Sequence, residues 1–244
     1  MGVYTWCARS LKKGYKGVLL PRIVAALGEG LTYSAESAFS KDDFLAMDLF
    51  SRDIDNFSSE DEIAGKVGDV TYAIHEIRAT RTEGSGKHRR TVTVFAGPMV
   101  RLDFNKNFAG HTVVVSNAES QILGGLFGES DTRQGKTLSR MENPEFENAF
   151  SVYSTDDQQA RYILTPKLME LILGAAQRLN TDVRLAFAHN SVFVAVRDSR
   201  NRFEATLFKS VTPDSALGDF VEVLGLVESL VTTLELETRI WSRV

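Results

Sequence analysis

The clearest start and stop signals of secondary structure lie in the stretch Asn143-Pro-Glu-Phe-Glu-Asn-Ala-Phe-Ser-Val-Tyr-Ser-Thr-Asp-Asp-Gln-Gln-Ala-Arg-Tyr-Ile-Leu-Thr-Pro166. A helical pattern follows it. An apolar run at 150–153, stopped by the polar residues 154–157, predicts a strand and a turn. Thr165 before Pro166 predicts a helix start, because threonine can cap the helix while proline lacks an N–H that would have no partner there. One apolar stripe follows at helical spacing: Leu168, Leu171, Ile172, Ala175 and Leu179. We therefore predict a central helix at about 166–179, ended by Asn180.

Working outward toward the N-terminus, alternating apolar residues predict strands. The pattern Val70, Tyr72, Ile74 slips toward Ile77 and Ala79, which indicates a long strand with a bulge. Glycines at 84 and 86 predict a flexible hairpin tip, and a second strand returns through 92–104. A turn at 105–110 leads to a third strand at 111–116. We predict that these three strands are antiparallel neighbours.

Alternation resumes after the central helix. Residues 183–187 and 192–196 predict two strands joined by a turn at 189–191, and residues 203–207 continue the pattern. A long C-terminal helix is predicted at about 215–236 from its apolar stripe. Ser40 with Asp43 resembles a capping box and predicts a helix of about ten residues, and the polar segment 51–61 predicts an exposed connection. The predicted fold class is α+β with antiparallel sheet or sheets.

The N-terminal segment from Arg9 to Leu27 alternates basic and apolar residues, with no acidic residue before Glu29. This pattern predicts a basic amphipathic helix, kinked or restarted at Pro21. Such a helix either lies on an anionic membrane surface or packs on the body with its lysines in water. We divide the chain into this helical segment at 1–30, a strand-rich subdomain at 31–135 and an α+β subdomain at 136–244, with one continuous domain as the alternative.

Composition restricts the function classes. The 244 residues are 43% hydrophobic and 25% charged, as expected for a soluble globular protein with a sizeable core. A net charge of -4 argues against a nucleic-acid partner bound through bulk charge. The single cysteine, Cys7, allows no internal disulfide and fits a reducing compartment. No apolar run has the length of a membrane span, and no signal peptide of the usual form is present.

The strings at 145–153 and 160–166, preceded by Val-Arg-Leu-Asp-Phe-Asn-Lys at 100–106, resemble the bacterial family named domain of unknown function 3137. The resemblance extends from about Tyr33 to Glu237, and Ala-Arg-Tyr-Ile-Leu-Thr-Pro is its most specific part. Members of that family commonly carry hydrophobic membrane segments ahead of the soluble region. The resemblance therefore implies a soluble module of a membrane-associated bacterial protein, and it implies no catalytic residue. Either this chain is a soluble member or its anchor is not part of this sequence.

Catalytic and metal-binding motifs find little support. The histidines are far apart in sequence without metal-ligand spacing, so we expect surface or hairpin histidines and no metal site: His75, His88, His111 and His189. The glycines at 124–128 lack the lysine of a phosphate loop, and no cofactor is predicted. Cys7 has no companion histidine nearby. Acidic residues could act as acid and base only if folding brought them together in a cleft.

The clearest indication of a binding site is a cluster of basic residues at the predicted hairpin. Arg78 and Arg81 face the loop residues Lys87, Arg89 and Arg90 across the predicted hairpin, and could hold a phosphate or a phospholipid head group. The alternative is a solvated sheet edge whose cations deter aggregation. Arg161 is expected to pair with Asp156 or Asp157.

Two functional hypotheses follow. The first is a non-enzymatic binding or scaffold module at the cytoplasmic face of a bacterial membrane, cytoplasmic and either peripheral or anchored in the full-length protein. Its partner would be an anionic membrane surface or a protein. Its anion or lipid contacts would come from the N-terminal and hairpin cations: Lys12, Lys13, Lys16, Arg78, Arg81, Lys87, Arg89 and Arg90. The second is a hydrolase-type enzyme whose acidic residues converge only in the fold.

Overall fold

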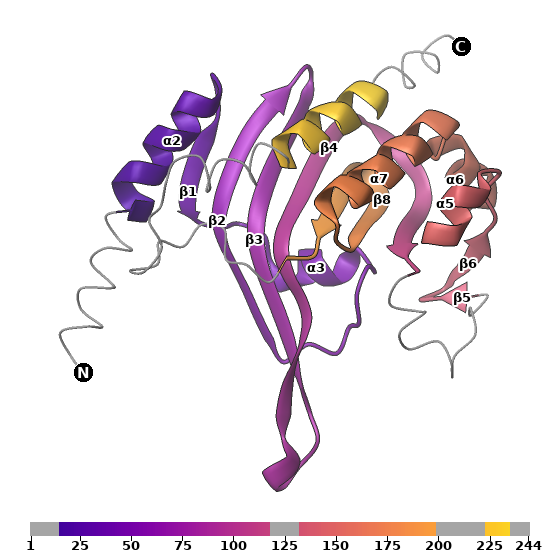
Figure 1. Ribbon diagram of the computed structural model, residues 1–244, viewed down its shortest axis with the longest axis horizontal. Helices are drawn as coiled ribbons and strands as arrows, with labels where there is room; N and C mark the ends of the chain where they lie inside the picture. Colours follow the sequence, from indigo (N-terminus) through magenta and orange to yellow (C-terminus); the bar gives the residue numbers. More distant parts are fainter. Residues whose placement is uncertain (1–14, 118–131, 199–222, 235–244) are drawn as a thin grey trace.

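A computed structural model describes residues 15–117, 132–198 and 223–234. Its centre is one antiparallel sheet with helices on both faces, so the predicted α+β class is confirmed. Helix α7 and the helical residues 223–234 lie on one face, whereas α3 lies on the other (Figure 1). The hairpin formed by the end of β3 (Val70–Glu83) and the start of β4 (Arg90–Ser116) projects beyond the body of the sheet (Figure 1).

The sheet has eight strands in the order β1-β2-β3-β4-β7-β6-β5, and β8 pairs with β4. Strands from both sides of residue 135 therefore lie in the same sheet. The bounds of the strands are β1 Thr32–Glu36, β2 Asn56–Val67, β3 Val70–Glu83, β4 Arg90–Ser116, β5 Thr132–Arg133, β6 Lys136–Ser139, β7 Phe150–Ser154 and β8 Val183–Val196.

Strand β8 doubles back between the two halves of β4. Residues 191–195 pair with 99–103, and residues 185–188 pair with 111–114. The two ends of β8 lie side by side, because the backbone N–H of Arg197 donates to the carbonyl of Asp182 at 2.9 Å. His189, with φ of 53°, marks the reversal, which confirms the predicted turn. The predicted pairing of strands 92–104 and 111–116 as neighbours is wrong, because both halves of β8 separate them.

The segment of β4 that passes around this reversal is held by aromatic contacts. The ring of Phe108 meets those of Phe104 and Phe187 edge-on, at centroid separations of 5.9 and 5.7 Å. Such T-shaped contacts favour a fixed ring arrangement. Residues 105–110 were predicted as a simple turn. They instead belong to the long strand β4, where it passes around the reversal of β8.

The helices begin with a π-helical turn at Tyr15–Leu19. Their other bounds are α2 Leu20–Leu27, α3 Lys41–Ala46, α5 Pro144–Ala149, α6 Asp157–Ile163 and α7 Pro166–Leu179, with a 3-10 turn at Gly86–His88 and helical residues 223–234. The central helix 166–179 is confirmed: the Thr165 hydroxyl accepts from the N–H of Leu168, and Asn180 adopts φ 47°, ψ 47°. Residues 9–14, 203–207, 215–222 and 235–236 of the predicted elements lie outside the described residues.

Replacing Thr165 by alanine should lower the free energy of unfolding by about 1 kcal/mol, because the N–H of Leu168 loses its capping oxygen. Urea unfolding of the full chain measures the change. Thr165→Ser keeps the hydroxyl and should stay near the wild-type value. Equal losses in the two variants would contradict a capping role.

Two local predictions near the N-terminus need correction. The capping box of Ser40 and Asp43 is present, but α3 has six residues rather than about ten, because Asp48 adopts φ 56° and the chain turns away. The segment 51–61, predicted as an exposed connection, contains the start of β2. From Asn56 to Glu60 exposed and half-buried positions alternate, and backbone pairing with β3 rather than apolar periodicity makes this part a strand.

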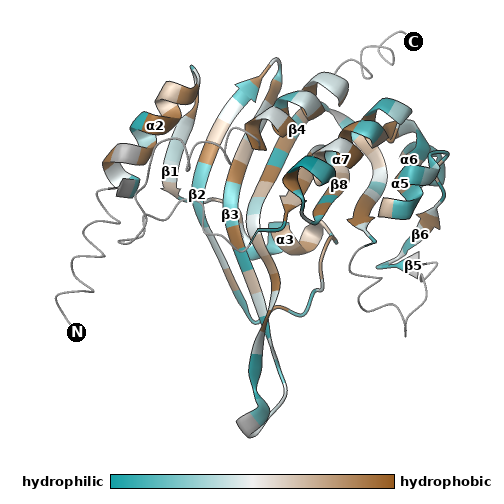
Figure 2. Cartoon of the chain, viewed as in Figure 1, coloured by the Kyte–Doolittle hydropathy of each residue, from teal (hydrophilic) through white to brown (hydrophobic). Residues whose placement is uncertain are grey.

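Each face of the sheet has its own apolar core, and hydrophobic positions alternate with polar ones along the strands (Figure 2). On one face, α2, α7 and residues 223–234 bury side chains such as Leu20, Leu168 and Leu230. On the other, α3 and the segment after it bury Phe44, Leu49 and others against β3, β4 and β8. The projecting hairpin lies beyond both cores and is largely hydrophilic (Figure 2).

Candidate anion-binding groove

Five arginines surround one groove at the root of the projecting hairpin, with a volume of about 620 Å³. They come from four strands and from the residue that follows β8. Its remaining walls are Phe50, Ser51, Glu83, Val92, Thr93 and Val94. The arginines are Arg81 of β3, Arg90 of β4, Arg133 of β5, Arg184 of β8, and Arg197.

Arg184 forms the innermost positive charge of the groove. Its side chain is only 5% exposed, and its Nε and Nη2 donate to one carboxylate oxygen of Asp182 at 2.9 and 2.7 Å. Its Nη1 donates to the carbonyl of Leu49 at 3.1 Å, and its guanidinium lies 4.8 Å from the ring centre of Phe50. Because these contacts hold the planar group in one orientation, Arg184 is positioned before any ligand arrives.

Arg133 and Arg197 are fixed in a similar way. Nη2 of Arg133 donates to the carbonyl of Leu49 at 2.8 Å. Nη2 of Arg197 donates to the carbonyl of Val94 at 3.1 Å, and its Nε lies 3.3 Å from Asp182 Oδ2. Asp182 thus orients two arginines at once.

The segment 47–50, which carries Phe50, is held by side chains from distant strands. His111 contacts the carbonyl of Met47 at 3.1 Å, and the side-chain amide of Gln134 donates to the carbonyl of Phe50 at 3.2 Å. Nearby, Lys136 is 2.7 Å from Asp48. Burial opposes the charge of Asp48, but the hydrogen bond and charge of Lys136 outweigh it and lower the pKa of Asp48. These contacts stabilise the groove wall.

The two outer arginines are clamped by Glu83. Arg81 donates through Nε and Nη2 to Oε1 at 3.0 and 2.6 Å, and Arg90 donates through the same atoms to Oε2 at 3.1 and 2.7 Å. These bonds lower the pKa of Glu83 and keep it ionised at neutral pH. Each guanidinium carries five N–H donors, so both arginines retain N–H groups for a ligand or water.

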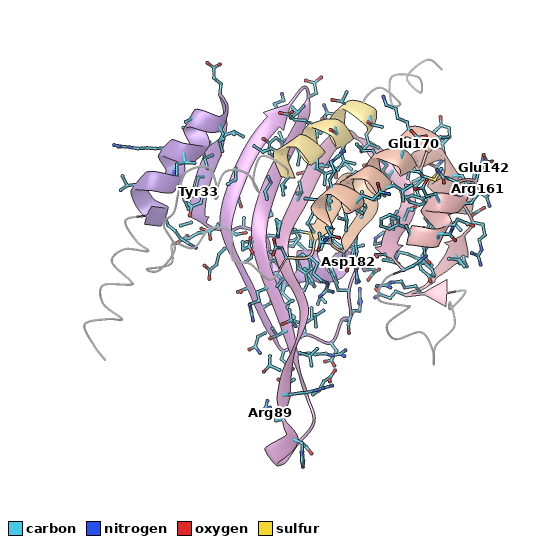
Figure 3. The ribbon with its side chains drawn as sticks, in the orientation of Figure 1. Tyr33, Arg89, Glu142, Arg161, Glu170 and Asp182 are labelled. Atoms are coloured by element: carbon cyan, nitrogen blue, oxygen red, sulfur yellow. The ribbon has the colours of Figure 1, made fainter. Side chains whose placement is uncertain are left out.

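The hairpin cations predicted from the sequence are only partly brought together. Arg81 and Arg90 line the groove, whereas Arg89 is exposed at the hairpin tip (Figure 3). Arg78 is exposed and lines a different cavity. Lys12, Lys13 and the side chain of Lys87 lie outside the described residues.

Lys16 lies in the interior, which corrects its predicted place on a membrane-facing surface. It is 8% exposed, contacts the buried carboxylate of Asp61, and lies 3.2 Å from Glu60. Burial by itself lowers the pKa of Lys16, but the hydrogen bond and charge of Asp61 raise it above its ordinary value. Tyr33 donates to the same carboxylate of Asp61, so the N-terminal helical segment is tied to β1 and β2 (Figure 3).

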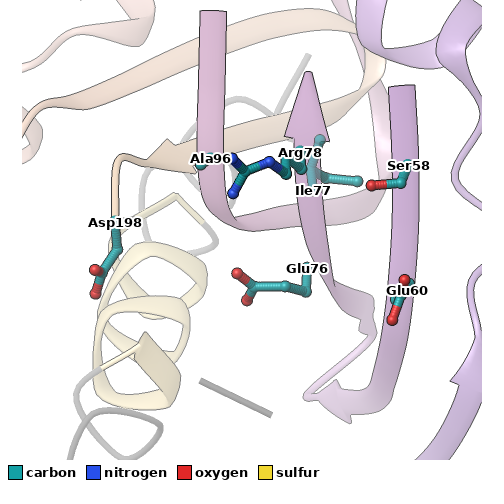
Figure 4. A pocket seen from close by; sticks show the side chains of 7 residues that line it. All are labelled: Ser58, Glu60, Glu76, Ile77, Arg78, Ala96 and Asp198. Carbon is teal, nitrogen blue, oxygen red and sulfur yellow. The ribbon is translucent and has the colours of Figure 1, made fainter. Parts of the chain in front are cut away.

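A second, smaller cavity brings three carboxylates together. Glu60, Glu76 and Asp198 line it together with Arg78 and three other residues, and its volume is about 110 Å³ (Figure 4). Pockets for small organic ligands usually exceed about 300 Å³. Glu60 also contacts Lys16. The cavity therefore offers room for a few water molecules but not for a typical substrate.

His75 is buried, contrary to the expected surface or hairpin position, because it lies on the same face of β3 as Ile77 and packs against Phe39. Its Nδ1 lies 2.9 Å from the hydroxyl of Ser37. Burial lowers the pKa of His75 to about 4, although the charge of Glu62 opposes the change. Burial also lowers the pKa of His111, and the charge of Lys136 adds to that effect. Within the described residues, no three histidine, cysteine or acidic side chains gather to hold a metal ion.

The comparison with known families gives one decisive match. The family described as "Protein of unknown function (DUF3137)" matches residues 93–236, which is more than half of the chain. The chain belongs to this family. No curated protein matches the DUF3137 chain in sequence. Arg133, Arg184 and Arg197 of the groove lie within the matched residues, whereas Arg81 and Arg90 precede them.

A solved structure shares the fold of this DUF3137 chain. The crystal structure of the mycobacterial trehalose monomycolate transport factor A, TtfA, superposes with a TM-score of 0.50 and 14% sequence identity. The match covers 91% of this chain and 95% of that one. At this identity the likeness concerns the fold alone. None of the helices described here is both long enough and apolar enough to cross a lipid bilayer.

Sequence reasoning missed three of the five groove arginines. One signal was available: Val183, Leu185 and Phe187 alternate on one face of their strand, which places Arg184 on the other. Arg133 and Arg197 border turns and carry no local pattern. Only the pairing of distant strands brings these side chains to the hairpin root.

Proposed function

We propose that this DUF3137 chain is a non-enzymatic binding module that attaches to the anionic, cytoplasmic face of a bacterial membrane by taking a lipid phosphate group into the arginine groove. The observation that carries the proposal is the convergence of five arginines on one groove in a chain whose net charge is -4. Glu83 bonds to Arg81 and Arg90, and Asp182 bonds to Arg184 and Arg197, so each of these carboxylates is shared by two guanidiniums.

Arginine suits this role because its planar fork can donate two parallel hydrogen bonds to a phosphate. The groove guanidiniums are already oriented by carboxylates and backbone carbonyls, which reduces the entropy lost when an anion binds. The projecting hairpin adds Arg89 at its tip (Figure 3), where it can meet the negative surface of a membrane without movement of the sheet.

The hydrolase alternative has weaker support. Its acidic residues do converge, at Glu60, Glu76 and Asp198, but around a cavity of about 110 Å³. An acid–base pair needs room for the substrate between the two carboxyl groups, and this cavity supplies little.

Co-sedimentation with vesicles tests the proposal. We expect salt-sensitive binding to vesicles that contain phosphatidylglycerol and no binding to phosphatidylcholine vesicles. Arg81→Gln with Arg90→Gln should weaken the binding roughly thirtyfold, because each cation near an anionic surface contributes about 1 kcal/mol. Inorganic phosphate at millimolar concentration should compete if the site recognises the phosphate group itself.

A matched variant separates the groove from bulk charge. Lys66→Gln with Arg161→Gln removes the same charge from exposed side chains that pair with Asp69 and Asp157 elsewhere on the chain. This control should bind vesicles nearly as well as the wild type. If both double variants lost binding equally, net charge rather than the groove would explain it. Binding to neither kind of vesicle would overturn the membrane proposal.

A further inference from the structure

The groove also offers apolar surface next to its charges. Val92 and Val94 are half-buried and line the same hollow as the five arginines. Phe50 lies beneath the guanidinium of Arg184. A small inorganic anion would contact the guanidiniums but would leave the valines exposed to water.

The arginines of the groove differ in how far their side chains are exposed to solvent. Arg184 is nearly buried at its inner end, whereas Arg90 is 75% exposed on the hairpin. A buried, fixed guanidinium interacts with an anion more strongly than an exposed one, because less solvent screens it. A molecule that reaches Arg184 must therefore enter the hollow, where less solvent screens its charge than at the rim.

We infer that the groove binds single molecules of an anionic amphiphile, with the phosphate on the arginines and the adjoining alkyl chain over Val92 and Val94. This inference rests on the proposed function and narrows its ligand. The charge complementarity selects a phosphate-bearing partner, and the valines select one with an apolar chain beside the phosphate. Binding thus includes extraction of part of the lipid from the membrane surface, and not only attraction to it.

Isothermal titration with soluble phosphates tests the inference on the full chain. The probes are ethyl phosphate and octyl phosphate, the latter below its micelle concentration, and octyl glucoside serves as an uncharged control. Burial of about two methylene groups of the longer chain raises affinity roughly tenfold. We therefore expect octyl phosphate to bind at least tenfold more tightly than ethyl phosphate, and octyl glucoside to bind far more weakly than octyl phosphate.

Two substitutions of opposite sign refine the test. Val92→Thr should reduce the preference for octyl phosphate severalfold, and Val92→Leu, which extends the apolar wall, should increase it. Ethyl phosphate should bind both variants as it binds the wild type. Val18→Thr changes an exposed valine that does not line the groove and should have no effect.

The outcomes separate this inference from the proposed function. Equal affinity for ethyl and octyl phosphate would overturn the amphiphile while leaving phosphate binding intact. Vesicle binding without binding of either soluble phosphate would also overturn it and would leave a surface attachment. Loss of all binding, to vesicles and to phosphates, would overturn both proposals.

Discussion

Replacing Lys16 by methionine should lower the free energy of unfolding by about 3 kcal/mol, because the Asp61 carboxylate would stay buried without its cation. Asp61 is 1% exposed, and among the described residues the Tyr33 hydroxyl is the side-chain donor that would remain. Methionine fills a similar volume, so the loss reports the unpaired charge rather than a cavity. Urea unfolding monitored by circular dichroism at neutral pH gives the value.

The reciprocal substitutions test the cause of that loss. Asp61→Asn should cost less, because Lys16 keeps Glu60 at 3.2 Å and asparagine tolerates the left-handed conformation at this position, where φ is 50°. The double variant should be more stable than Lys16→Met alone, since no charge is then buried without a partner. A double variant with the summed losses of the single variants would show that the two side chains do not interact.

The central helix could be predicted because all its signals are local. Thr165, Pro166 and Asn180 mark its ends within the same stretch that carries the apolar stripe, and each has the predicted role in the structure. The long strand β3 and the hairpin tip were predictable for the same reason, and Gly84 and Gly86 have the positive φ that a turn favours. The bulge predicted within β3 is wrong, because the extra residues lie in its neighbours, Asp61 of β2 and Val94 of β4. The apolar pattern slips because Ile74 and Ile77 face different cores.

The arrangement of β4 and β8 could not be predicted, because no local pattern records which strands become neighbours. The segments 92–104 and 111–116 have the pattern of adjacent antiparallel strands, yet a strand some eighty residues later inserts between them. Phe108 holds β4 where it passes around β8, and its contact with Phe187 forms only when β8 lies between the two parts of β4. Long-range pairing of this kind is a property of the whole sheet.

The binding groove was partly predictable for a related reason. Arg81 and Arg90 lie on the two strands of one hairpin, which sequence alone suggests. Arg184 and Arg197 reach the groove because the ends of β8 meet at Asp182, and that meeting depends on the reversal at His189. For Lys16 the sequence predicted a binding residue that the structure does not place on the surface. A basic residue on an amphipathic segment is usually solvated, but Lys16 is paired with Asp61, which lies in the bulge of β2.

The stability of the protein should fall by about 3 kcal/mol as the pH drops from about 6.5 to about 4, because of His75 alone. The folded state holds the pKa of His75 near 4, whereas an unfolded chain has the ordinary value near 6.5. Between these values the unfolded state binds more protons, so acid favours unfolding. The stabilisation is fully present above pH about 6.5 and is lost as the pH falls through the folded pKa. Urea unfolding at a series of pH values measures the slope.

His75→Asn isolates this contribution from other acid-sensitive groups, including His111. The asparagine oxygen can still accept from the hydroxyl of Ser37, so the variant removes the titrating group while keeping that contact. Its stability at pH 7 should decrease because a buried ring is lost, but its slope between pH 6.5 and 4 should be shallower than that of the wild type. His88→Asn, at the exposed hairpin tip, should leave the slope unchanged. A slope that His75→Asn does not alter would show that His75 is protonated as readily in the folded chain as in the unfolded one, which its burial against Phe39 at 5.0 Å argues against.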